Sequence, residues 1–286
     1  MSEKRKVAFI IHAKIRNSER LETKIKRVFQ KDFDLSFALT NKKNGAKDAS
    51  IEALQAGADF IVVAGGDGSI NEMINAYLEF GDSTTVLGVL PMGTGNDFSK
   101  SLSVKNDLHA LLGMIQSQQI HQVDVCRMAH IGTSGQPAQR YFINISDIGM
   151  GGLAVKNLNK GSKWLGSHLT YFYAVISSFF KYEKQKVRLN YDNGTWEGQI
   201  LSLCMANGKF FASGLCIAPD AKLDSGDFQL VVIGDVSLWV YFKNLLNLFQ
   251  GRKIVHNEVF YDRTTQCEII AIDDPCPIDM DGEFIG

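Results

Sequence analysis

The stretch FIVVAGGDGS at residues 60–69 decides how this chain folds, because it runs from an apolar strand directly into a glycine-rich turn. Five consecutive apolar residues are typical of a buried strand in a parallel sheet. The glycines leave backbone N–H groups uncovered by side chains, and the residues from Ile70 to Tyr77 can form a helix. N–H groups at the start of a helix favour a negatively charged ligand. The stretch therefore predicts a strand–turn–helix unit that binds phosphate.

A second stretch, VLGVLPMGTGND at residues 86–97, repeats this arrangement about 28 positions further along the chain. Each of the two turns carries an aspartate, Asp67 in the first and Asp97 in the second. An isolated Asp-Gly pair is more often an ordinary turn than a binding site. In an open α/β sheet, however, ligands bind at the carboxyl ends of the strands, where both turns are expected. Together the two turns favour a phosphate-binding edge of a sheet.

The first turn also predicts details of the backbone. We expect the three glycines of GGDG, residues 65–68, to adopt positive φ and to let a ligand approach the main chain. Ser69 and Glu72 have the spacing of a capping box at the start of the helix. The P-loop pattern G-x-x-x-x-G-K-[ST] is missing, and the first strand and turn, residues 7–17, contain no glycine. The sequence thus argues against a P-loop enzyme and against a Rossmann dehydrogenase.

The chain changes character near residue 123, which predicts an N-terminal α/β domain, residues 1–122, and a β-rich domain, residues 123–286. Before that point strand and helix patterns alternate, as in a parallel sheet covered by helices. After it, short β-type runs separated by turn signals dominate. We expect strands at Val7–Ile11, Asp34–Leu39, Phe60–Ala64 and Val86–Leu90, and then at Tyr141–Ile145, Val187–Tyr191, Gln199–Ala206, Gln229–Val232 and Gln266–Ile272.

Two helical segments interrupt the β-rich domain, at residues 163–180 and 237–250. In each, apolar side chains recur at steps of three and four, which places them in a stripe along one face. We expect both stripes to pack on a sheet; the alternative is contact with a membrane or with an acyl chain. The stripe residues are Leu165, Leu169, Phe172, Ile176 and Phe179 in the first segment, and Trp239, Phe242, Leu245, Leu246 and Phe249 in the second.

Composition narrows the class of protein. Of the 286 residues 45% are hydrophobic and 21% are charged, which is typical of a globular protein with a core. The net charge of −1 gives no support for a nucleic-acid partner. Five cysteines without CxxC spacing favour a reducing compartment over a zinc site or disulfides. Neither a signal peptide nor a transmembrane run is found, so we expect a cytoplasmic protein with at most peripheral membrane contact.

The two glycine turns carry a resemblance to a known family. VAGGDGSINEM at 63–73 resembles the GGDGT-x-NE signature of the diacylglycerol kinase catalytic domain. LPMGTGNDF at 90–98 is similar to the second signature of that family, LPxGTxNDF. GGDGT alone also occurs in NAD kinases and, more loosely, in phosphofructokinases, so the second stretch is the more specific. Order and spacing resemble the soluble bacterial lipid kinases of the YegS type, related to sphingosine and ceramide kinases, over nearly the whole chain.

The resemblance implies a fold, cofactors and site residues. It implies an α/β domain like that of NAD kinase and phosphofructokinase, a lipid-binding β-sandwich, and an active site in the cleft between the two. ATP and Mg²⁺ are the implied cofactors. The implied catalytic residues are Asp67, Asp281 as general base in the segment DGE, and Glu283 as its support. The implied nucleotide-binding residues are Gly65, Gly66, Gly68, Ser69, Asn71, Glu72, Gly93, Thr94, Gly95 and Asn96.

An acidic segment, PDAKLDSGD at 219–227, resembles the family's P-x-A-x-x-x-D-G segment, which can hold a structural Mg²⁺. Asp224 and Asp227 are its candidate metal ligands, because oxygen ligands at short spacing suit that cation. Ser225 separates the expected Asp-Gly pair, however. A simple turn is therefore an equal alternative at this place.

Two other features depart from the family pattern. Where the first strand usually ends in NP-x-SG, this chain has HAKIRN at 12–17, in which Lys14 and Arg16 are candidate phosphate-binding cations. The chain also ends at Gly286, shortly after DGE, where family members usually continue through another strand.

Three functions remain open from the sequence. The leading hypothesis is an ATP-dependent kinase that phosphorylates a hydroxyl of a diacylglycerol-like or sphingoid-like lipid. The second is a soluble kinase like NAD kinase, for which the stretch at 90–98 would not be expected. The third is a catalytically silent nucleotide- or lipid-binding protein, suggested by the missing NP-x-SG. The oligomeric state is left open, with a homodimer as one candidate.

Overall fold

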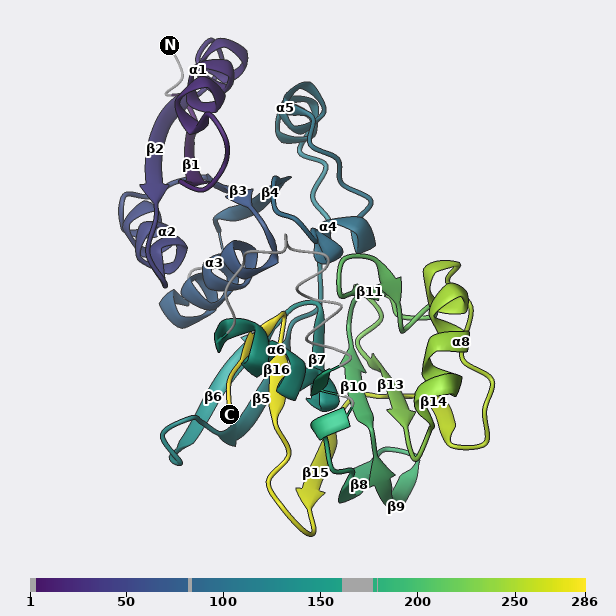
Figure 1. The fold of residues 1–286 in the computed structure, drawn as a ribbon. Coiled ribbons are helices and arrows are strands. Elements are labelled where there is room, and N and C mark those ends of the chain that lie inside the picture. The colour runs from purple at the N-terminus through teal and green to yellow at the C-terminus, as the bar shows by residue number, and fades with distance from the viewer. Residues whose placement is uncertain (1–3, 82–83, 161–176, 179) are drawn as a thin grey trace. The chain divides into compact units, whose positions relative to one another are not determined.

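The computed structural model describes residues 4–81, 84–160, 177–178 and 180–286 (Figure 1). The chain divides into two compact units, Met1–Gln122 and Val123–Gly286. In the described residues no helix is both long enough and apolar enough to span a bilayer.

The N-terminal unit is built on a parallel sheet with the strand order β2-β1-β3-β4. Its strands are β1 (Lys6–His12), β2 (Asp34–Thr40), β3 (Phe60–Gly65) and β4 (Val86–Pro91). Each begins and ends within one residue of the predicted strand. All six residues of β3 are buried, as expected for a strand covered on both faces.

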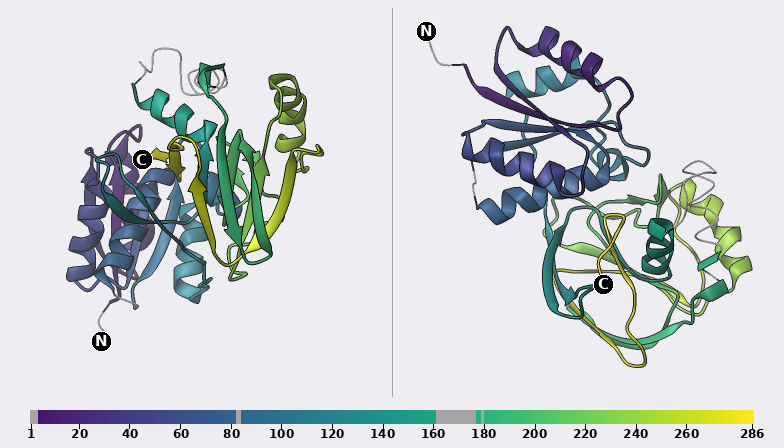
Figure 2. Two further views of the ribbon diagram at one scale, coloured as in Figure 1. Left: turned by 90° about the horizontal axis from the view of Figure 1, so that it is seen from below. Right: turned by 60° about the vertical axis from the view of Figure 1, so that its left-hand side comes forward.

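Helices cover both faces of this sheet (Figures 1 and 2). On one face, α1 (Ser18–Phe29) and α5 (Leu108–Ser117) share a core with alternate residues of β1 and β3. On the other face, α2 (Gly45–Gln55) and α3 (Asp67–Phe80) pack against each other and against the same two strands. A short helix, α4 (Asp97–Ser101), follows β4. Because α3 and α4 begin directly after β3 and β4, both glycine turns lie at the carboxyl edge of the sheet.

The C-terminal unit contains a six-stranded antiparallel sheet with the order β14-β13-β10-β7-β16-β17 and a three-stranded sheet with the order β15-β8-β9. A two-stranded ribbon, β5 (Cys126–Ile131) with β6 (Pro137–Phe142), and a short pair, β11 (Phe210–Phe211) with β12 (Leu215–Cys216), complete it. The remaining strands are β7 (Ile145–Gly149), β8 (Gln185–Tyr191), β9 (Gly194–Ile200), β10 (Ser202–Ala206), β13 (Phe228–Ile233), β14 (Val259–Thr264), β15 (Cys267–Ala271), β16 (Ile278–Met280) and β17 (Glu283–Phe284).

The two larger sheets of this unit pack into a sandwich. Side chains from one face of the six-stranded sheet form a core with Val187, Leu189 and Ile200 of the three-stranded sheet. The other face is covered by α6 (Met150–Lys160) and α8 (Leu238–Phe249), which contribute Ala154 and Leu248 to a second core. The predicted fold class, a parallel α/β domain followed by a β-sandwich, is confirmed.

Two of the predicted strands are each divided between two strands in the structure. Tyr141–Ile145 spans the end of β6 and the start of β7, and Gln199–Ala206 spans β9 and β10. Each break is a point where the chain passes from one sheet to another. At the first, the N–H groups of residues 143–145 bind the Asp281 carboxylate, about 140 residues away in the chain, so no local pattern could mark it.

The helix predicted at 237–250 is confirmed as α8, but the three stripe residues whose side chains the structure describes do not pack inward. Trp239, Leu246 and Phe249 are exposed, whereas Asn244 and Leu248 are buried. Because Leu248 is buried and these three are not, apolar residues occur on both sides of this helix, and their spacing alone does not tell which side packs inward. Most of the other predicted stripe, at 163–180, lies outside the described residues.

Candidate functional site

The two glycine turns of the N-terminal unit are in direct contact. A Cβ atom added at Gly66 would lie 3.1 Å from the Cα of Gly93, and one added at Gly93 would overlap Gly66. A Cβ at Gly65 would lie 2.9 Å from the hydroxyl of Ser69. Side chains are therefore excluded because the two backbones touch. The turns form one structure at the end of β3 and β4.

The predicted reason for these glycines was partly wrong. Gly66 has φ of −103°, and none of the three glycines of GGDG is among the residues with positive φ. The glycines at 66 and 93 allow the two turns to approach each other closely, and the approach of a ligand, the other expected role, stays a prediction. The capping box was also wrong, because α3 begins at Asp67 and Ser69 lies inside the helix.

Asp67 ties the second turn to the first. One of its carboxylate oxygens accepts the N–H of Phe98 at 3.0 Å and the other accepts the N–H of Asp97 at 3.2 Å, which caps the start of α4. Burial raises the pKa of Asp67; these N–H groups oppose the rise and the nearby Asp97 carboxylate adds to it. The side chain thus combines a fixed position with a raised proton affinity.

Several residues predicted to bind nucleotide make hydrogen bonds within the protein, and their contact with nucleotide stays a prediction. The Asn96 amide accepts the N–H of Gly93 and donates to its carbonyl, both at 2.8 Å, which closes the second turn. The Glu72 carboxylate accepts the N–H groups of Asn44, Ala46 and Lys47 and so caps α2. Asn71 is buried and accepts from Asn75. Gly68 and Ser69 lie in the first helical turn of α3. Thr94 and Gly95 lie in the second glycine turn, between β4 and α4.

The sequence did not point to a hollow of about 460 Å³ at the carboxyl end of β2. Thr40 and Asn41 line it from the end of the strand, and Gly45 and Ala49 line it from α2. Because the sheet is parallel, this hollow lies at the same edge as the two turns. Its volume falls within the range of pockets for small ligands.

In the C-terminal unit, Asp281 anchors a stretch of backbone. One oxygen accepts the N–H of Ile143 at 2.9 Å, and the other accepts those of Asn144 and Ile145, both at 3.0 Å. Asp281 is buried and has a left-handed φ of 49°. Three of the roughly four lone-pair positions of this carboxylate are therefore already used. Its neighbour Glu283 pairs with Arg140 at 2.8 Å.

Beside Asp281 lie two buried asparagines that the sequence did not single out. The Nδ2 of Asn144 donates to the carbonyl of Phe210, and that of Asn207 donates to those of Asp124 and Ile143, all at 2.8 Å. In the described part of the chain, neither Oδ1 atom has a hydrogen-bond partner. Buried acceptors of this kind favour a donor from a water or a ligand. Only the assembled fold brings these residues together.

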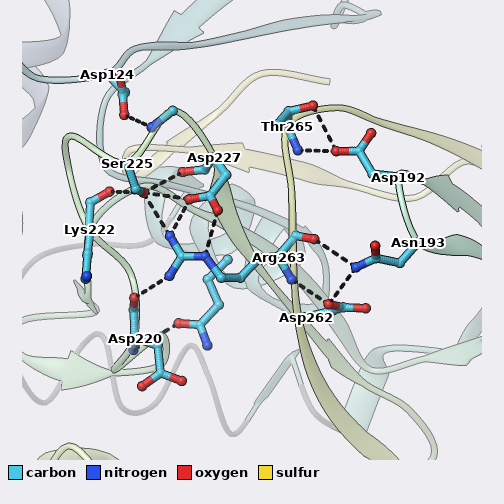
Figure 3. Close-up of polar contacts among 12 residues, drawn as sticks. Asp124, Asp192, Asn193, Asp220, Lys222, Ser225, Asp227, Asp262, Arg263 and Thr265 are labelled. Atoms are coloured by element: carbon cyan, nitrogen blue, oxygen red, sulfur yellow. Dashed lines mark hydrogen bonds and ion pairs between the residues drawn. The ribbon is translucent and has the colours of Figure 1, made fainter.

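An arginine takes the place that the sequence assigned to a metal ion (Figure 3). Arg263 binds both oxygens of Asp227, with Nε at 2.7 Å from Oδ2, and also donates to Ser225 Oγ and to the carbonyl of Asp220. Its guanidinium holds the pKa of Asp227 below the ordinary value. Asp224 is exposed, and the described residues contain no group of three His, Cys, Asp or Glu side chains that suits a metal. Asp224 and Asp227 therefore do not fit a structural Mg²⁺.

We expect the loop at 219–227 to be stable without a metal. EDTA should leave the Tm of the wild type unchanged, and Arg263→Met should lower the free energy of unfolding by about 1–2 kcal/mol, since the pair is bidentate but partly exposed. Arg188→Met, which breaks an exposed pair with Glu197, is the control and should have almost no effect. A Tm that drops with EDTA or rises with Mg²⁺ would show that a metal is bound after all.

A second buried carboxylate, Asp147, lies in the middle of the six-stranded sheet. Its Oδ1 accepts the hydroxyl of Ser202 at 2.6 Å, and Asp279 stands opposite it in the pairing of β7 with β16. Burial raises the pKa of Asp147 to about 7. Burial and the nearby Asp147 also raise the pKa of Asp279 well above its ordinary value. Both groups are therefore more readily protonated in the folded chain than in the unfolded chain.

This pair predicts a stability that falls as the pH rises. Between about pH 4 and 7 the folded state keeps a proton that the unfolded state has lost, so each step upward in pH favours unfolding. Asp147→Asn keeps the acceptor for Ser202 and removes the charge. It should raise the free energy of unfolding at pH 8 by something on the order of 3 kcal/mol and have little effect at pH 4. Urea unfolding at both pH values is the measurement, and equal effects at the two would contradict this account.

Comparisons with known proteins agree with these features. The model of the diacylglycerol kinase catalytic domain matches residues 6–128, and that of the YegS C-terminal NAD kinase beta sandwich-like domain matches residues 147–286. A diacylglycerol kinase of Staphylococcus carnosus is 28% identical over 255 residues, covering 89% of this chain and 79% of that protein. One from Staphylococcus aureus is 29% identical over 245 residues, covering 84% and 73%.

Solved structures agree in fold. The crystal structure of a diacylglycerol kinase from Bacillus anthracis superposes with a TM-score of 0.69 at 22% identity, covering 98% of this chain and 91% of that one. Another structure from the same organism gives a TM-score of 0.74 at 22% identity, covering 99% and 92%. The paired glycine turns, the order of the two units and both family models lead to one conclusion. The chain belongs to the diacylglycerol kinase catalytic-domain family and carries the YegS type of C-terminal domain.

Proposed function

We propose that this protein transfers the γ-phosphoryl group of ATP to a hydroxyl of a diacylglycerol-like or sphingoid-like lipid. The contact of the two glycine turns at the carboxyl edge of the sheet supports this proposal most strongly. α3 begins there after Gly66, a residue without a side chain to cap the helix. The positive end of the helix is thus available for a phosphate group.

Phosphoryl transfer requires positioned phosphates, neutralisation of their charge and a group that accepts the proton of the attacking hydroxyl. In this proposal the two turns position the phosphates, and Mg²⁺ bound with ATP would supply charge neutralisation there. Asp67 and Asp97 are the carboxylates of the turns closest to that position. The hollow at the end of β2 is the candidate site for the nucleoside.

We assign proton acceptance to Asp67 in preference to Asp281. Burial raises the pKa of Asp67, and a raised pKa favours a carboxylate as a general base. Asp281 already accepts three backbone N–H groups, so its principal task is to hold residues 143–145. Asn144 and Asn207, with their buried acceptor oxygens, are candidates to bind the polar head of the acceptor lipid.

Incubation with γ-labelled ATP and Mg²⁺ tests the proposal. The full chain is offered short-chain, detergent-dispersed diacylglycerol, ceramide and sphingosine in parallel with NAD, and Asp67→Ala serves as the inactive control. Label in one or more lipids, absent in the control, is the expected result. Label in NAD would identify the protein as a soluble kinase like NAD kinase. No label in any acceptor would make it a silent member of the family.

A further inference from the structure

The outward side of α8 exposes large apolar side chains from a single face. Trp239 is 77% exposed, Leu246 70% and Phe249 62%. They are separated by seven and three residues, which places them on the same side of a helix. We call these three residues the α8 face. Single exposed apolar residues are common, but a large aligned group with an exposed tryptophan marks an interaction surface.

The side of α8 opposite the α8 face packs into the core of the C-terminal unit. Leu248 is buried in the core beneath the six-stranded sheet, and Asn244 is buried beside it. The side chain of Ser237 caps the start of the helix by accepting the N–H of Val240. The helix is therefore packed against the core and capped at its start by contacts that do not involve the α8 face. In the part of the chain that the structure describes, the three side chains of that face stay exposed.

Between Asp235 and Glu258 the charged side chains of the α8 segment are all basic. From Val236 to Asn257 the sequence has no aspartate or glutamate, but it has Lys243, Arg252 and Lys253. Lys243 lies four residues after Trp239 and three before Leu246, so it shares their side of the helix. Lys253 forms an ion pair with Asp220. Lys243 and Arg252 form no ion pair with any residue that the structure describes.

We propose that the α8 face docks on a membrane surface that contains anionic lipids. An apolar face with tryptophan, phenylalanine and leucine, flanked by basic side chains, has the composition of helices that lie in the membrane interface. Apolar side chains enter the acyl boundary, and the amines and guanidinium stay with the phosphates of the headgroups. This inference rests on the proposed function, since a lipid kinase must reach a substrate that stays in the bilayer. The basic charge distinguishes a membrane from a second copy of the chain, which would bring the same positive charges together.

Sedimentation with vesicles tests the docking surface in the absence of ATP and substrate. The full chain is mixed with phosphatidylcholine vesicles, with and without phosphatidylglycerol. We expect the double variant Trp239→Ser with Phe249→Ser to reduce binding to the mixed vesicles roughly tenfold or more. Lys243→Gln with Arg252→Gln should remove the preference for phosphatidylglycerol. Ile131→Ser, which changes an equally exposed apolar residue on β5, is the matched control and should bind like the wild type.

The fluorescence of Trp239 gives a second readout that does not depend on protein yield. Its emission should shift to shorter wavelength with mixed vesicles, and Trp239→Phe should lose the shift. Equal vesicle binding by the wild type and the α8 variants would overturn the inference. So would a dimer in gel filtration that the α8 variants convert to a monomer. Phosphorylation of short-chain, detergent-dispersed lipid tests the proposed function separately, because that substrate requires no docking and the α8 variants should retain it.

Discussion

Gly93→Ala should reduce ATP binding and turnover roughly 100-fold or more, the largest effect of a single methyl group that we expect in this chain. The added Cβ would overlap the Cα of Gly66 and lie 2.9 Å from the Asn96 oxygen that closes the second turn. Neither neighbour can move cheaply, because one is backbone and the other is fixed by two hydrogen bonds. The two turns must therefore separate, and the N–H groups that we propose bind phosphate move with them.

Substitutions at Gly66 should reduce ATP binding to an extent that depends on the size of the new side chain. Gly66→Ala should be milder, since its Cβ would lie 3.1 Å from Gly93, whereas Gly66→Val should again block nucleotide binding. Gly113→Ala is the control: nothing lies within 4 Å of its Cβ in α5, and it should stabilise the protein by about 0.5–1 kcal/mol. Calorimetry with ATP and the Tm of each variant provide the measurements. Unchanged ATP affinity in a folded Gly93→Ala protein would rule out the phosphate cradle.

Asp67→Asn should lower kcat by about 10²–10⁴-fold, a loss that its effect on stability does not account for. The substitution removes the proton-accepting oxygen and keeps one acceptor for the start of α4, but its NH₂ group then faces the second N–H there, so a small loss of Tm is also expected. Asp281→Asn should cost more stability, because the Asp281 carboxylate is the acceptor for three N–H groups, those of residues 143–145. An unsatisfied buried donor costs about 1–3 kcal/mol. Asp281→Asn should therefore lower the Tm by roughly 5 °C, and its activity should fall with its stability.

The comparison of kcat with Tm in these two variants separates a base from an anchor. Asp279→Asn is a useful third variant, because Asp279 flanks the same motif and should affect turnover much less. If Asp281→Asn kept the wild-type Tm but lost turnover, and Asp67→Asn remained active, Asp281 would be the base, as the motif alone suggests.

Local patterns predicted the N-terminal unit well because its strands and helices are set by neighbours in sequence. The uninterrupted apolar run at Phe60–Ala64 marked a strand buried on both faces, and the glycines after it marked the turn. The C-terminal unit was harder, since its strands leave one sheet and enter another at residues without a local signal. Where the chain leaves β6, the N–H groups of residues 143–145 bind a carboxylate from the end of the chain, a partner that no local pattern reveals.

In the candidate site, too, the sequence identified which residues gather, and the folded structure decided what each of them contacts. GGDG and GTGND identified which residues gather at the carboxyl edge, but the contact of Gly66 with Gly93 depends on the pairing of β3 with β4. Glu72 reads as part of the nucleotide signature, yet its carboxylate caps α2, a helix that precedes it by some twenty residues. The acidic loop at 219–227 reads as a metal site until Arg263 is brought to it by the pairing of β13 with β14.

The sequence by itself determined the order of the two units, the α/β and β-sandwich classes, and the two glycine turns at the carboxyl edge of the parallel sheet. These depend on apolar periodicity and on residues that are close in the chain, and both are visible along it. Only the tertiary structure decided which carboxylates are already occupied, which cation holds the acidic loop, and which face of α8 is exposed. Those properties depend on pairs of groups far apart in the chain, and the distance and burial that fix their energies exist only after folding.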